Sequence, residues 1–505
     1  MPSQQSIKAG DRTIKLNTWQ FIGNEWKEAV GKSTFGIENP STGEEVIQVS
    51  EGKAEDVDIA VKTARKTFKD PAYKEMNPTD RSAILQKLAD LMQENFDDLV
   101  ALEMLDTGKT HKQCSNLDVP ASIGTLRYYA GWADKVLGLS SFNIPKTFAY
   151  TKREPVGVCG QIIPWNFPLL MFTWKIAPAF ACGNTVVIKS AEATPLSALY
   201  MCDLIVKAGF PAGSINLITG YGKNAGAAIA SHMDVNKVAF TGSTVTGRSI
   251  LKAAASSNLK KVTLELGGKR NIIFPDADLK KAIEWSIWGI NMNFGQTCHA
   301  GTRIYVHEDV YDEFLELYTA RMKKMVVGDN FDKNNTQGPQ NSKMQYEKIL
   351  GYIDSGKSDG ATVHLGGNAI KGKDGSKGYF IEPTIFTNVT ANMKIMREEI
   401  FGPVVAIAKF KTEEEVIEMA NDTTYGLAAG VHTKDYERAI RVTSALEAGT
   451  TWVNMYNFVH WSIPFGGYKE SGIGRECGEA ALENYTEVKA VYFNMGMRAP
   501  DALDD

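Results

Sequence analysis

The chain has 505 residues, of which 43% are hydrophobic and 23% charged, so it has the composition of a globular protein with room for about three structural units. Lysine and arginine number 55 and aspartate and glutamate 59, which gives a formal net charge of −4. Because no basic block accompanies this charge, the sequence lacks the electrostatic pattern of a nucleic-acid-binding protein. The most apolar stretch, residues 162–188, is interrupted by Pro164, Pro168 and Pro178 and is therefore not expected to cross a membrane.

Cysteine and histidine usage indicates a reducing compartment without a metal site. The seven histidines show no HxxxH or Cys/His grouping. No apolar run precedes Trp19, so we expect a cytoplasmic protein, with a short organellar signal as the alternative. The six cysteines form no CxxC pair, which is typical of reduced thiols; they are Cys114, Cys159, Cys182, Cys202, Cys298 and Cys477. Small-molecule chemistry is the function class that remains.

The first long periodic segment predicts one amphipathic surface helix over residues 79–105. Further along, apolar strand-like runs alternate with a helical segment over residues 195–208. Thr194 is the expected N-cap of this helix, Pro195 lies in its first turn, and Gly209 follows its end. The strands are expected at residues 158–163, 185–189, 215–219 and 238–240. Such alternation predicts a doubly wound parallel sheet.

A second run of alternating elements predicts a separate α/β domain. Its expected elements are strands at 262–266 and 271–274, a helix at 279–290, a strand at 303–306, a helix at 310–325 and a strand at 404–410. Two further β-prone segments, residues 142–152 and 488–493, have no neighbouring strand in the sequence. We expect these isolated strands to pair with each other or with a second subunit.

A polar, glycine-flanked loop, residues 291–301, presents the thiol of Cys298. Glycine allows close backbone approach, and a backbone N–H beside a thiol can bind an oxyanion. Cys298 is therefore a candidate nucleophile, with a small buried hydrophobe as the alternative. Glu265 lies at a strand end before two glycines, where burial raises a carboxyl pKa toward that of a general base. A surface glutamate at a strand end is its alternative.

Two strand-to-helix turns are candidate ligand sites. Asn166 follows the strand that ends at Ile163, and its amide N–H is suited to a developing oxyanion. An ordinary turn is the alternative. Residues 240–247 place two glycines where a diphosphate would meet a helix N-terminus, although a tight turn explains the same pattern. Lys189 and Glu192, beyond another strand end, could bond ribose hydroxyls.

Together these segments resemble the aldehyde dehydrogenase superfamily, and look most like its cytosolic and mitochondrial NAD-dependent branch, from Trp19 to Phe493. The motifs, in the family's order and spacing, are PWNFPLLM, FTGSTVTGR, LELGGK, GQTCHAGTR, EEIFGPV and PFGGYKESGIGRE. The resemblance implies that Cys298 is the nucleophile, Glu265 the general base and Asn166 the oxyanion donor. It implies a cofactor site formed by Lys189, Glu192, Gly242, Ser243, Trp165, Glu399 and Phe401.

The resemblance further implies a three-part subunit that assembles into a dimer or homotetramer. Glu476 matches a position proposed to relay protons and Glu487 one at the subunit interface, with plain surface glutamates as the alternative. The expected parts are a Rossmann-like NAD-binding domain (1–135 and 155–266), a catalytic α/β domain (267–470), and a small β oligomerisation element with the C-terminal tail (136–154 and 471–505).

The implied reaction oxidises an aldehyde to its carboxylic acid through a thiohemiacetal and a thioester on Cys298, with water activated by Glu265. A carboxylate at Glu192 would favour NAD over NADP, because a 2′-phosphate would meet like charge. The alternatives are a structural or binding protein with a dead site, a CoA-acylating relative and a thioester-forming hydrolase. The presence of Cys298, Glu265 and Asn166 argues against a dead site, and CoA-acylating relatives commonly lack the glutamate.

The implied substrate channel is apolar, which favours an uncharged apolar or aromatic aldehyde. A carboxylate-bearing substrate would need a cationic partner, and no lysine or arginine occurs from Trp452 to Ile463. Packing of the same aromatics in the core is the alternative. The expected channel residues are Phe167, Leu170, Trp174, Met292, Val459 and Phe465, with Phe458 and Trp461 near the mouth.

The sequence departs from the family pattern at a few positions without losing a candidate catalytic group. Ser190 replaces a proline and Arg270 stands where serine is common. The neighbours of the nucleophile are Thr297 and His299. His299 either tunes the thiol or only lines the loop.

Overall fold

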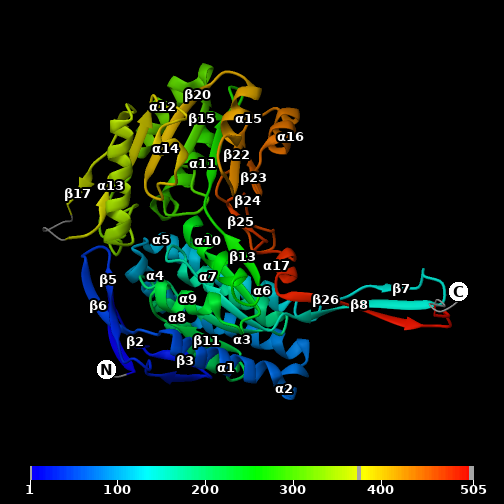
Figure 1. Ribbon diagram of the computed structural model, residues 1–505. Coiled ribbons are helices and arrows are strands. Elements are labelled where there is room, and N and C mark those ends of the chain that lie inside the picture. Colours follow the sequence, from blue (N-terminus) through cyan, green and yellow to red (C-terminus); the bar gives the residue numbers. More distant parts are fainter. Residues whose placement is uncertain (1–2, 372–376, 500–505) are drawn as a thin grey trace.

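The computed structural model describes residues 3–371 and 377–499 and contains two central sheets flanked by helices (Figure 1). The first sheet has eight strands, in the order β25 (Gly472–Ile473), β13 (Lys261–Glu265), β12 (Lys237–Thr241), β9 (Val158–Ile162), β10 (Thr185–Lys189), β11 (Ile215–Ile218), β3 (Gln20–Ile22) and β4 (Glu25–Lys27). The strands from β13 to β11 run parallel, and the others join antiparallel. Since β9 is the first parallel strand in the chain, the strand order reverses between β9 and β12, which is where such sheets bind ligands.

Helices connect the parallel strands of the first sheet. α7 (Pro168–Ala181) links β9 to β10, α8 (Leu196–Ala208) links β10 to β11, and α10 (Thr244–Ala255) links β12 to β13. All residues of α7 are buried, because the helix packs between β10 and α6 (Val119–Ala130). Its one charged residue is Lys175, and this buried charge needs a partner.

The second sheet has seven strands and is parallel except for one edge strand. The chain enters it directly after Glu265, through residues 266–268. The predicted α/β class with parallel sheets is thus confirmed. The strand order is β16 (Thr362–Leu365), β19 (Thr384–Thr387), β20 (Val404–Phe410), β15 (Arg303–His307), β14 (Lys269–Ile273), β22 (Ala428–His432) and β23 (Thr450–Val453).

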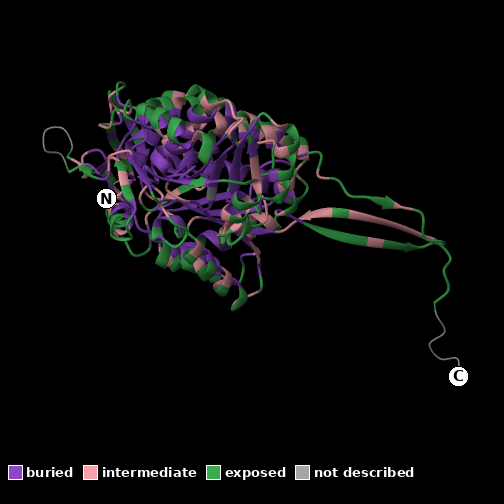
Figure 2. Ribbon diagram, turned by 90° about the horizontal axis from the view of Figure 1, so that it is seen from above, coloured by how far each residue is buried: buried purple, intermediate pink, exposed green. Residues whose placement is uncertain are grey.

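A three-stranded arm projects from the body of the molecule (Figures 1 and 2). β26 (Thr486–Asn494) pairs antiparallel with β8 (Thr147–Pro155), which also pairs with β7 (Ser140–Ser141). The prediction that the two isolated β-prone segments pair with each other is confirmed. Within the arm, β26 is mostly exposed and β8 is mostly of intermediate burial, as the green and pink colours of Figure 2 show. Part of the predicted C-terminal tail, from residue 500 onward, lies outside the described residues.

The other described helices surround the two sheets, and short hairpins lie at the periphery. The hairpins are β1 (Gln4–Ala9) with β2 (Arg12–Asn17), β5 (Thr34–Asn39) with β6 (Glu44–Ser50), and β17 (Ala369–Ile370) with β18 (Phe380–Ile381). A further antiparallel pair, β21 (Tyr425–Gly426) with β24 (Tyr468–Lys469), joins strands that are distant in the sequence. The helices are α1 (Ala54–Lys69), α2 (Pro71–Lys74), α3 (Pro78–Glu94), α4 (Phe96–Thr107), α5 (His111–Gln113), η1 (Cys114–Asp118), η2 (Gly222–Gly226), α9 (Ala227–Ser231), α11 (Leu279–Asn291), η3 (Met292–Gly295), α12 (Glu308–Met322), α13 (Lys343–Ser358), α14 (Lys394–Arg397), α15 (Glu413–Asn421), α16 (Tyr436–Ala445) and α17 (Ala480–Glu483).

The prediction of one long surface helix over residues 79–105 is wrong. The segment forms two helices, α3 and α4, which meet at Asn95. Asn95 leaves the helical conformation, and its side-chain amide donates to the backbone carbonyl of Leu91 at 2.8 Å, in competition with the helical hydrogen bonds. α4 is also not a surface helix, since it is buried from Leu99 to Thr107. No described helix is long and apolar enough to span a membrane.

Two details of the predicted helices also differ. The side chain of Thr194 makes no capping hydrogen bond to α8. Instead, the backbone N–H of Leu196 donates to the buried carboxylate of Asp106 at 3.0 Å, so a residue from α4 satisfies the helix N-terminus. Gly209 ends α8 in the left-handed conformation, as expected. The helix predicted at residues 310–325 spans Glu308–Met322, because the His307 side chain accepts from Asp309 N and starts it two residues earlier.

Candidate active site

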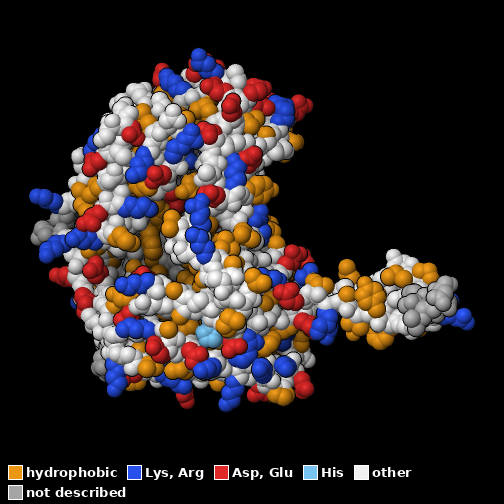
Figure 3. All heavy atoms as spheres, in the orientation of Figure 1, with side chains coloured by type: hydrophobic (Ala, Val, Ile, Leu, Met, Phe, Trp, Pro, Cys, Tyr) orange, Lys and Arg blue, Asp and Glu red, His pale blue; other side chains and the backbone are white. Residues whose placement is uncertain are grey.

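One pocket collects side chains at the carboxyl ends of β9, β12 and β13, where the first sheet faces the second. The face seen in Figure 3 is hollowed between the parts of the molecule that carry the two sheets, and hydrophobic side chains line the hollow. Lys189 and Glu192 do not line the pocket. The predicted site residues that do are Cys298, Glu265, Asn166, Trp165, Gly242, Ser243, Glu399, Phe401, Phe167, Leu170, Trp174, Met292, Val459 and Phe465.

The loop that carries Cys298 has an unusual backbone. Asn293 and Phe294 both adopt left-handed conformations, with φ of 47° and 55°, and Gly295 follows at 78°. A Cβ at Gly295 would overlap the carbonyl oxygen of Gly402, so this turn requires glycine. All six cysteines are described, and Cys298 is the one that is not buried. The packing therefore directs a single accessible thiol into the pocket.

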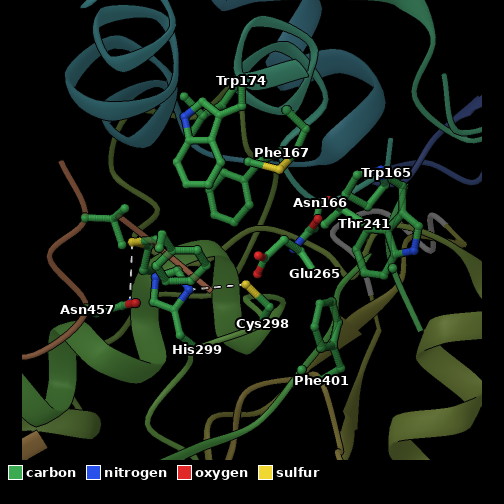
Figure 4. Close-up of a pocket in the computed structure, with 18 of the residues that line it drawn as sticks. Trp165, Asn166, Phe167, Trp174, Thr241, Glu265, Cys298, His299, Phe401 and Asn457 are labelled. Carbon is green, nitrogen blue, oxygen red and sulfur yellow. Dashed lines mark hydrogen bonds between the residues drawn. The ribbon is translucent and has the colours of Figure 1, made fainter. Parts of the chain in front are cut away.

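The Cys298 sulfur lies beside an imidazole. Its Sγ is 3.2 Å from Nδ1 of His299, and both groups line the pocket (Figure 4). The backbone carbonyl of Cys298 accepts from Gly268 N at 3.0 Å, which ties the loop to the segment after Glu265. The sequence placed His299 next to the thiol in the chain, but only the structure brings its ring nitrogen to the sulfur.

Asn166 is oriented toward the same space by the cysteine loop. Its amide Nδ2 donates to the backbone carbonyl of Gln296 at 2.9 Å, and its own backbone carbonyl accepts from Asn293 Nδ2 at 2.8 Å. The first bond orients the side-chain amide of Asn166, and the second holds its backbone. The amide carries a second N–H besides the one that bonds to Gln296. Asn166 thus lines the same pocket as Cys298, and its amide group is labelled in Figure 4.

Glu265 is a buried carboxylate that faces the thiol. Its side chain points into the same part of the pocket as the Cys298 sulfur (Figure 4), and its Oε2 accepts no hydrogen bond from the residues that the structure describes. Burial raises the pKa of Glu265 well above its ordinary value, and the negative charge of Glu476 raises it further. Lys175 and Arg475 act in the opposite direction. The surface alternative for Glu265 is excluded by its burial.

Lys175 of α7 pairs with Glu476 behind Glu265. The two charged atoms are 2.5 Å apart, and Lys175 also donates to Thr241 Oγ1 at 2.9 Å. Both side chains are almost fully buried, so each charge satisfies the other. Sequence reasoning missed Lys175, although a lone lysine within an apolar helix was a usable signal. Glu487, by contrast, lies on the arm and pairs with Lys261 at 2.8 Å.

The opposite side of the pocket is formed by the turns after β9 and β12. Ser243 caps α10, since its Oγ accepts from Thr246 N at 3.3 Å, and Gly242 N donates to Glu265 O at 3.1 Å. The helix N-terminus thus opens on the pocket, which suits an anionic ligand group. The rings of Trp165 and Phe401 meet edge to face with centroids 5.4 Å apart.

Glu399 and Gln345 complete this side, which we call the polar side of the pocket. A Cβ at Gly267 would overlap the Glu399 carboxylate, so only glycine allows that close approach. Gln345 of α13 donates to the Phe401 carbonyl at 3.1 Å, and Lys348 lines the pocket one helical turn further on. Sequence reasoning missed Gln345 and Lys348, because a polar helix face gives no sign of the pocket it borders.

Lys189 and Glu192 lie together beyond β10, outside the pocket. Lys189 Nζ donates to Glu192 Oε2 at 3.1 Å and to the Ser190 carbonyl at 2.8 Å. Burial lowers the pKa of Lys189, and the Glu192 charge opposes that change. Lys189 is buried while Glu192 is exposed, so the carboxylate is open to a ligand that crosses this strand end.

The apolar side of the pocket contains the six expected channel residues, and aromatic contacts organise it. Trp174 meets Phe465 edge to face at 5.9 Å. Trp461 lines the pocket over Gly124 of α6, where a Cβ would lie 2.7 Å from the indole ring. Phe458, in contrast, borders a neighbouring hollow together with Trp285 and is exposed.

Of the departures from the family pattern, the structure gives a role to Arg270. Arg270 is buried, and its Nη2 donates to the Glu447 backbone carbonyl at 3.1 Å, so it links β14 to the segment before β23. Nothing in the structure explains Ser190. Within the described residues, no group of three or more histidine, cysteine, aspartate or glutamate side chains is arranged to hold a metal ion.

Comparison with known proteins identifies the family. Residues 26–491 match the family model described as the aldehyde dehydrogenase family. An aldehyde dehydrogenase of Alternaria alternata is 58% identical over 96% of this chain and 99% of its own, and retinal dehydrogenase 2 of Rattus norvegicus is 53% identical over 97% and 95%. A solved structure of an aldehyde dehydrogenase from Bacillus cereus in complex with NAD⁺ is 46% identical over 97% of this chain and 100% of that chain, with a TM-score of 0.93.

These findings cover nearly the whole chain. The chain therefore belongs to the aldehyde dehydrogenase family, whose members are oxidoreductases that act on aldehydes. The resemblance on which the sequence analysis relied is confirmed.

Proposed function

We propose that this protein oxidises an apolar or aromatic aldehyde to its carboxylic acid through a thioester on Cys298, with NAD as the oxidant. The observation that carries the proposal is the convergence of Cys298, Glu265 and Asn166 on one pocket whose other wall is apolar (Figure 4). A thiol, an unsatisfied carboxylate and an amide donor are the groups that acyl transfer through a thioester requires.

In this mechanism each residue acts at a stated atom. The Cys298 sulfur attacks the aldehyde carbon, and the Asn166 amide and the Cys298 backbone N–H stabilise the negative charge on the carbonyl oxygen. A bound NAD would supply the hydride acceptor that the oxidation of this adduct requires. Glu265 then removes a proton from a water molecule that attacks the thioester, which releases the acid and restores the thiol.

Residues on the polar side of the pocket fit NAD. Ser243 and Gly242 present the α10 N-terminus to a diphosphate, and Trp165, Glu399 and Phe401 border the space toward the thiol. The exposed Glu192 carboxylate would accept ribose hydroxyls and repel a 2′-phosphate, so NAD is preferred over NADP. The NAD⁺ complex of the Bacillus cereus relative supports this assignment. Equal kcat/KM for NAD and NADP would contradict this preference for NAD. Glu192→Ala should reduce the difference in kcat/KM between the two cofactors.

The substrate class follows from the apolar wall. Phe167, Trp174 and Phe465 would bury an apolar tail, which stabilises binding by about 25 cal/mol per Å². The related retinal dehydrogenase 2 is named for an apolar aldehyde, which supports the same class. Because a Cβ at Gly124 would displace Trp461, Gly124→Ala should raise KM for bulky aldehydes more than for acetaldehyde.

The organisation of the subunit is part of the proposal. The two sheets and the arm support a Rossmann-like NAD-binding domain, a catalytic domain and an oligomerisation element. One strand differs from the predicted boundaries, because β25, which they give to the oligomerisation element, pairs with β13 of the first sheet. The arm exposes Phe142, Tyr492 and Phe493, which supports a dimer or tetramer built through it. A cytoplasmic location, inferred from the cysteine pattern, completes the proposal.

An NADH-fluorescence assay with purified protein tests this function. Acetaldehyde, hexanal, phenylacetaldehyde and succinic semialdehyde are compared with NAD and without CoA, and Cys298→Ser is the negative control. We expect the highest kcat/KM for hexanal or phenylacetaldehyde and no activity in the variant. A requirement for CoA would contradict hydrolytic deacylation, and a preference for the semialdehyde would contradict the substrate class.

A further inference from the structure

We propose that His299 is a second catalytic base beside Glu265, whose Nδ1 takes the proton of the Cys298 thiol and holds the thiolate for attack. This inference rests on the proposed function, because it assigns the activation of the nucleophile within that reaction. The carrying observation is the 3.2 Å contact between Cys298 Sγ and His299 Nδ1, drawn as a dashed line in Figure 4.

The imidazole is held in place by aromatic rings. Its centroid lies 5.2 Å from that of Phe465, edge to face, and 5.9 Å from that of Trp452. Trp452 is itself fixed, since its indole N–H donates to the Phe458 carbonyl at 2.8 Å. His299 is buried in this wall, so its ring has little freedom to turn away from the sulfur.

The backbone holds the sulfur equally firmly. Ala300 N donates to Thr297 O at 3.0 Å and closes a tight turn around the two residues. Thr297 Oγ1 donates to Met292 O at 3.1 Å, and Gly268 N donates to Cys298 O at 3.0 Å. Sulfur and imidazole therefore belong to one rigid turn, as a nucleophile and its base require.

The group in hydrogen-bond contact with the thiol is His299 and not Glu265. Nδ1 of His299 lies 3.2 Å from the Cys298 sulfur, whereas Oε2 of Glu265 has no hydrogen-bond partner among the described residues. The pocket's other charged side chains, Glu399 and Lys348, belong to the polar side. The rings packed against the imidazole, Trp452 and Phe465, carry no titratable group. The structure thus divides the work: His299 acts on the thiol and Glu265 on the water.

The proton transfer is balanced without any other reactant. The S–H bond of Cys298 breaks, an N–H bond forms at Nδ1 of His299, and no group is oxidised or reduced. In the thiol form the sulfur donates to Nδ1, and in the thiolate form Nδ1–H donates to the sulfur. When the sulfur attacks the aldehyde carbon, the imidazolium passes its proton to the carbonyl oxygen or to solvent and returns to the neutral state.

The test is the pH dependence of Cys298 alkylation by iodoacetamide in the full-length protein, followed by intact mass. The other five cysteines are buried, and Cys298→Ser reports their background. His299→Asn keeps a polar group near the Nδ1 position but cannot titrate, and His299→Leu removes the polar group. His460→Asn is the matched control, because that histidine bonds to Ser462 Oγ at 2.6 Å and not to the thiol.

We expect wild type and His460→Asn to react at neutral pH about tenfold faster than either His299 variant, because an unassisted thiol with a pKa of about 8.5 is only a few per cent thiolate there. Identical profiles for wild type and His299→Asn would overturn the proposal. So would a profile that changes in Glu265→Gln but not in His299→Asn.

A second measurement avoids the His299 variants in case they fold poorly. The ultraviolet absorbance of the thiolate is titrated in wild type, with Cys298→Ser subtracted. We expect thiolate already at neutral pH, and a single midpoint at about 8.5 would overturn the proposal. Since neither assay contains aldehyde or NAD, failure of the proposed dehydrogenase reaction would appear separately, as absent NADH.

Discussion

Glu103 and Glu265 are both buried glutamates, but their surroundings are opposite. Glu103 accepts hydrogen bonds from Leu169 N at 3.1 Å and Ser197 Oγ at 2.5 Å, and Lys109 Nζ lies 3.7 Å away. Lys109 is also paired with Asp118. Oε2 of Glu103 has no hydrogen-bond partner among the described residues, but it faces the Lys109 cation. Glu265 lines a pocket, and its Oε2 has neither a hydrogen-bond partner nor an ion-pair partner among the described residues.

Burial raises the pKa of both groups, that of Glu103 to about 7, so burial alone does not separate them. The two glutamates differ instead in their partners, because Glu103 accepts hydrogen bonds and lies beside a cation. A buried carboxylate that is surrounded by donors stabilises the fold, and removing its partner leaves an uncompensated charge. A buried carboxylate without donors destabilises the fold and is free to bind a proton or water. The comparison therefore identifies Glu265, the buried glutamate that lines a pocket without a partner for its Oε2 among the described residues, as the one to test for a chemical role.

The largest expected effect is on turnover in Glu265→Gln. Loss of a general base typically reduces a rate by about 10²–10⁴-fold, so the variant should accumulate acyl-enzyme. Intact mass after mixing with hexanal and NAD measures it. Glu103→Gln is the matched control, and we expect it to retain turnover per folded molecule. Normal turnover in Glu265→Gln would break the comparison.

Lys109→Met should be the most destabilising of these changes. It leaves Glu103 and Asp118 buried without a cation, which typically lowers the free energy of unfolding by about 3–5 kcal/mol. Urea denaturation measures this loss. Lys62→Met, which removes an exposed partner of Asp58, should change stability by less than about 1 kcal/mol. Equal losses in the two variants would contradict a structural role for the Lys109 cluster.

The pH dependence of deacylation should follow Glu265. Because its pKa is raised, the rate should rise with pH, by about tenfold per pH unit below that pKa. The folded state also holds this proton where the unfolded chain has lost it, so the free energy of unfolding should fall as pH rises through the same window. Glu265→Gln should abolish the part of this decrease in the free energy of unfolding that comes from Glu265. Single-turnover rates and urea melts across pH measure both, and a flat deacylation profile would count against the assignment.

The smallest effect is expected from Ser197→Ala. The variant removes one of the two hydrogen bonds to Glu103 Oε1, which should lower the free energy of unfolding by about 1–3 kcal/mol without changing kcat. Ser256→Ala, at an exposed helix end, is the control. A change in kcat in Ser197→Ala, with stability intact, would show that the cluster participates in the chemistry.

Much of the first sheet was predictable because parallel strands are buried on both faces and produce continuous apolar runs. β10 is such a strand, and every one of its residues is buried. Cys298 and Glu265 were predictable for a different reason: each interrupts local patterning with a reactive group beside glycine. The helix break at Asn95 was not, because a single asparagine competes only weakly with helical periodicity.

The paired charges could not be predicted, because they join distant parts of the chain. Lys175 meets Glu476 across 301 positions, and nothing in either local sequence specifies the other. Asp106, and not the predicted Thr194, accepts a hydrogen bond from the start of α8, and this contact also joins distant parts of the chain. The imidazole at His299 is adjacent in sequence to the thiol, but its rotamer is decided by Trp452 and Phe465.

The last strands of the chain complete structures begun much earlier. β25 adds to the edge of β13 beside Glu265, Glu476 reaches Lys175, and β26 pairs with β8. During synthesis the parallel core can form on the ribosome, while the outer edge of β13 and the edge of β8 that pairs with β26 stay open until the C-terminal segment emerges. An unpaired edge is a template for aggregation, so these two edges are exposed to wrong pairing until the last strands arrive. The Lys175–Glu476 pair, whose charges act on the pKa of Glu265, consequently forms only when the C-terminal segment has been made.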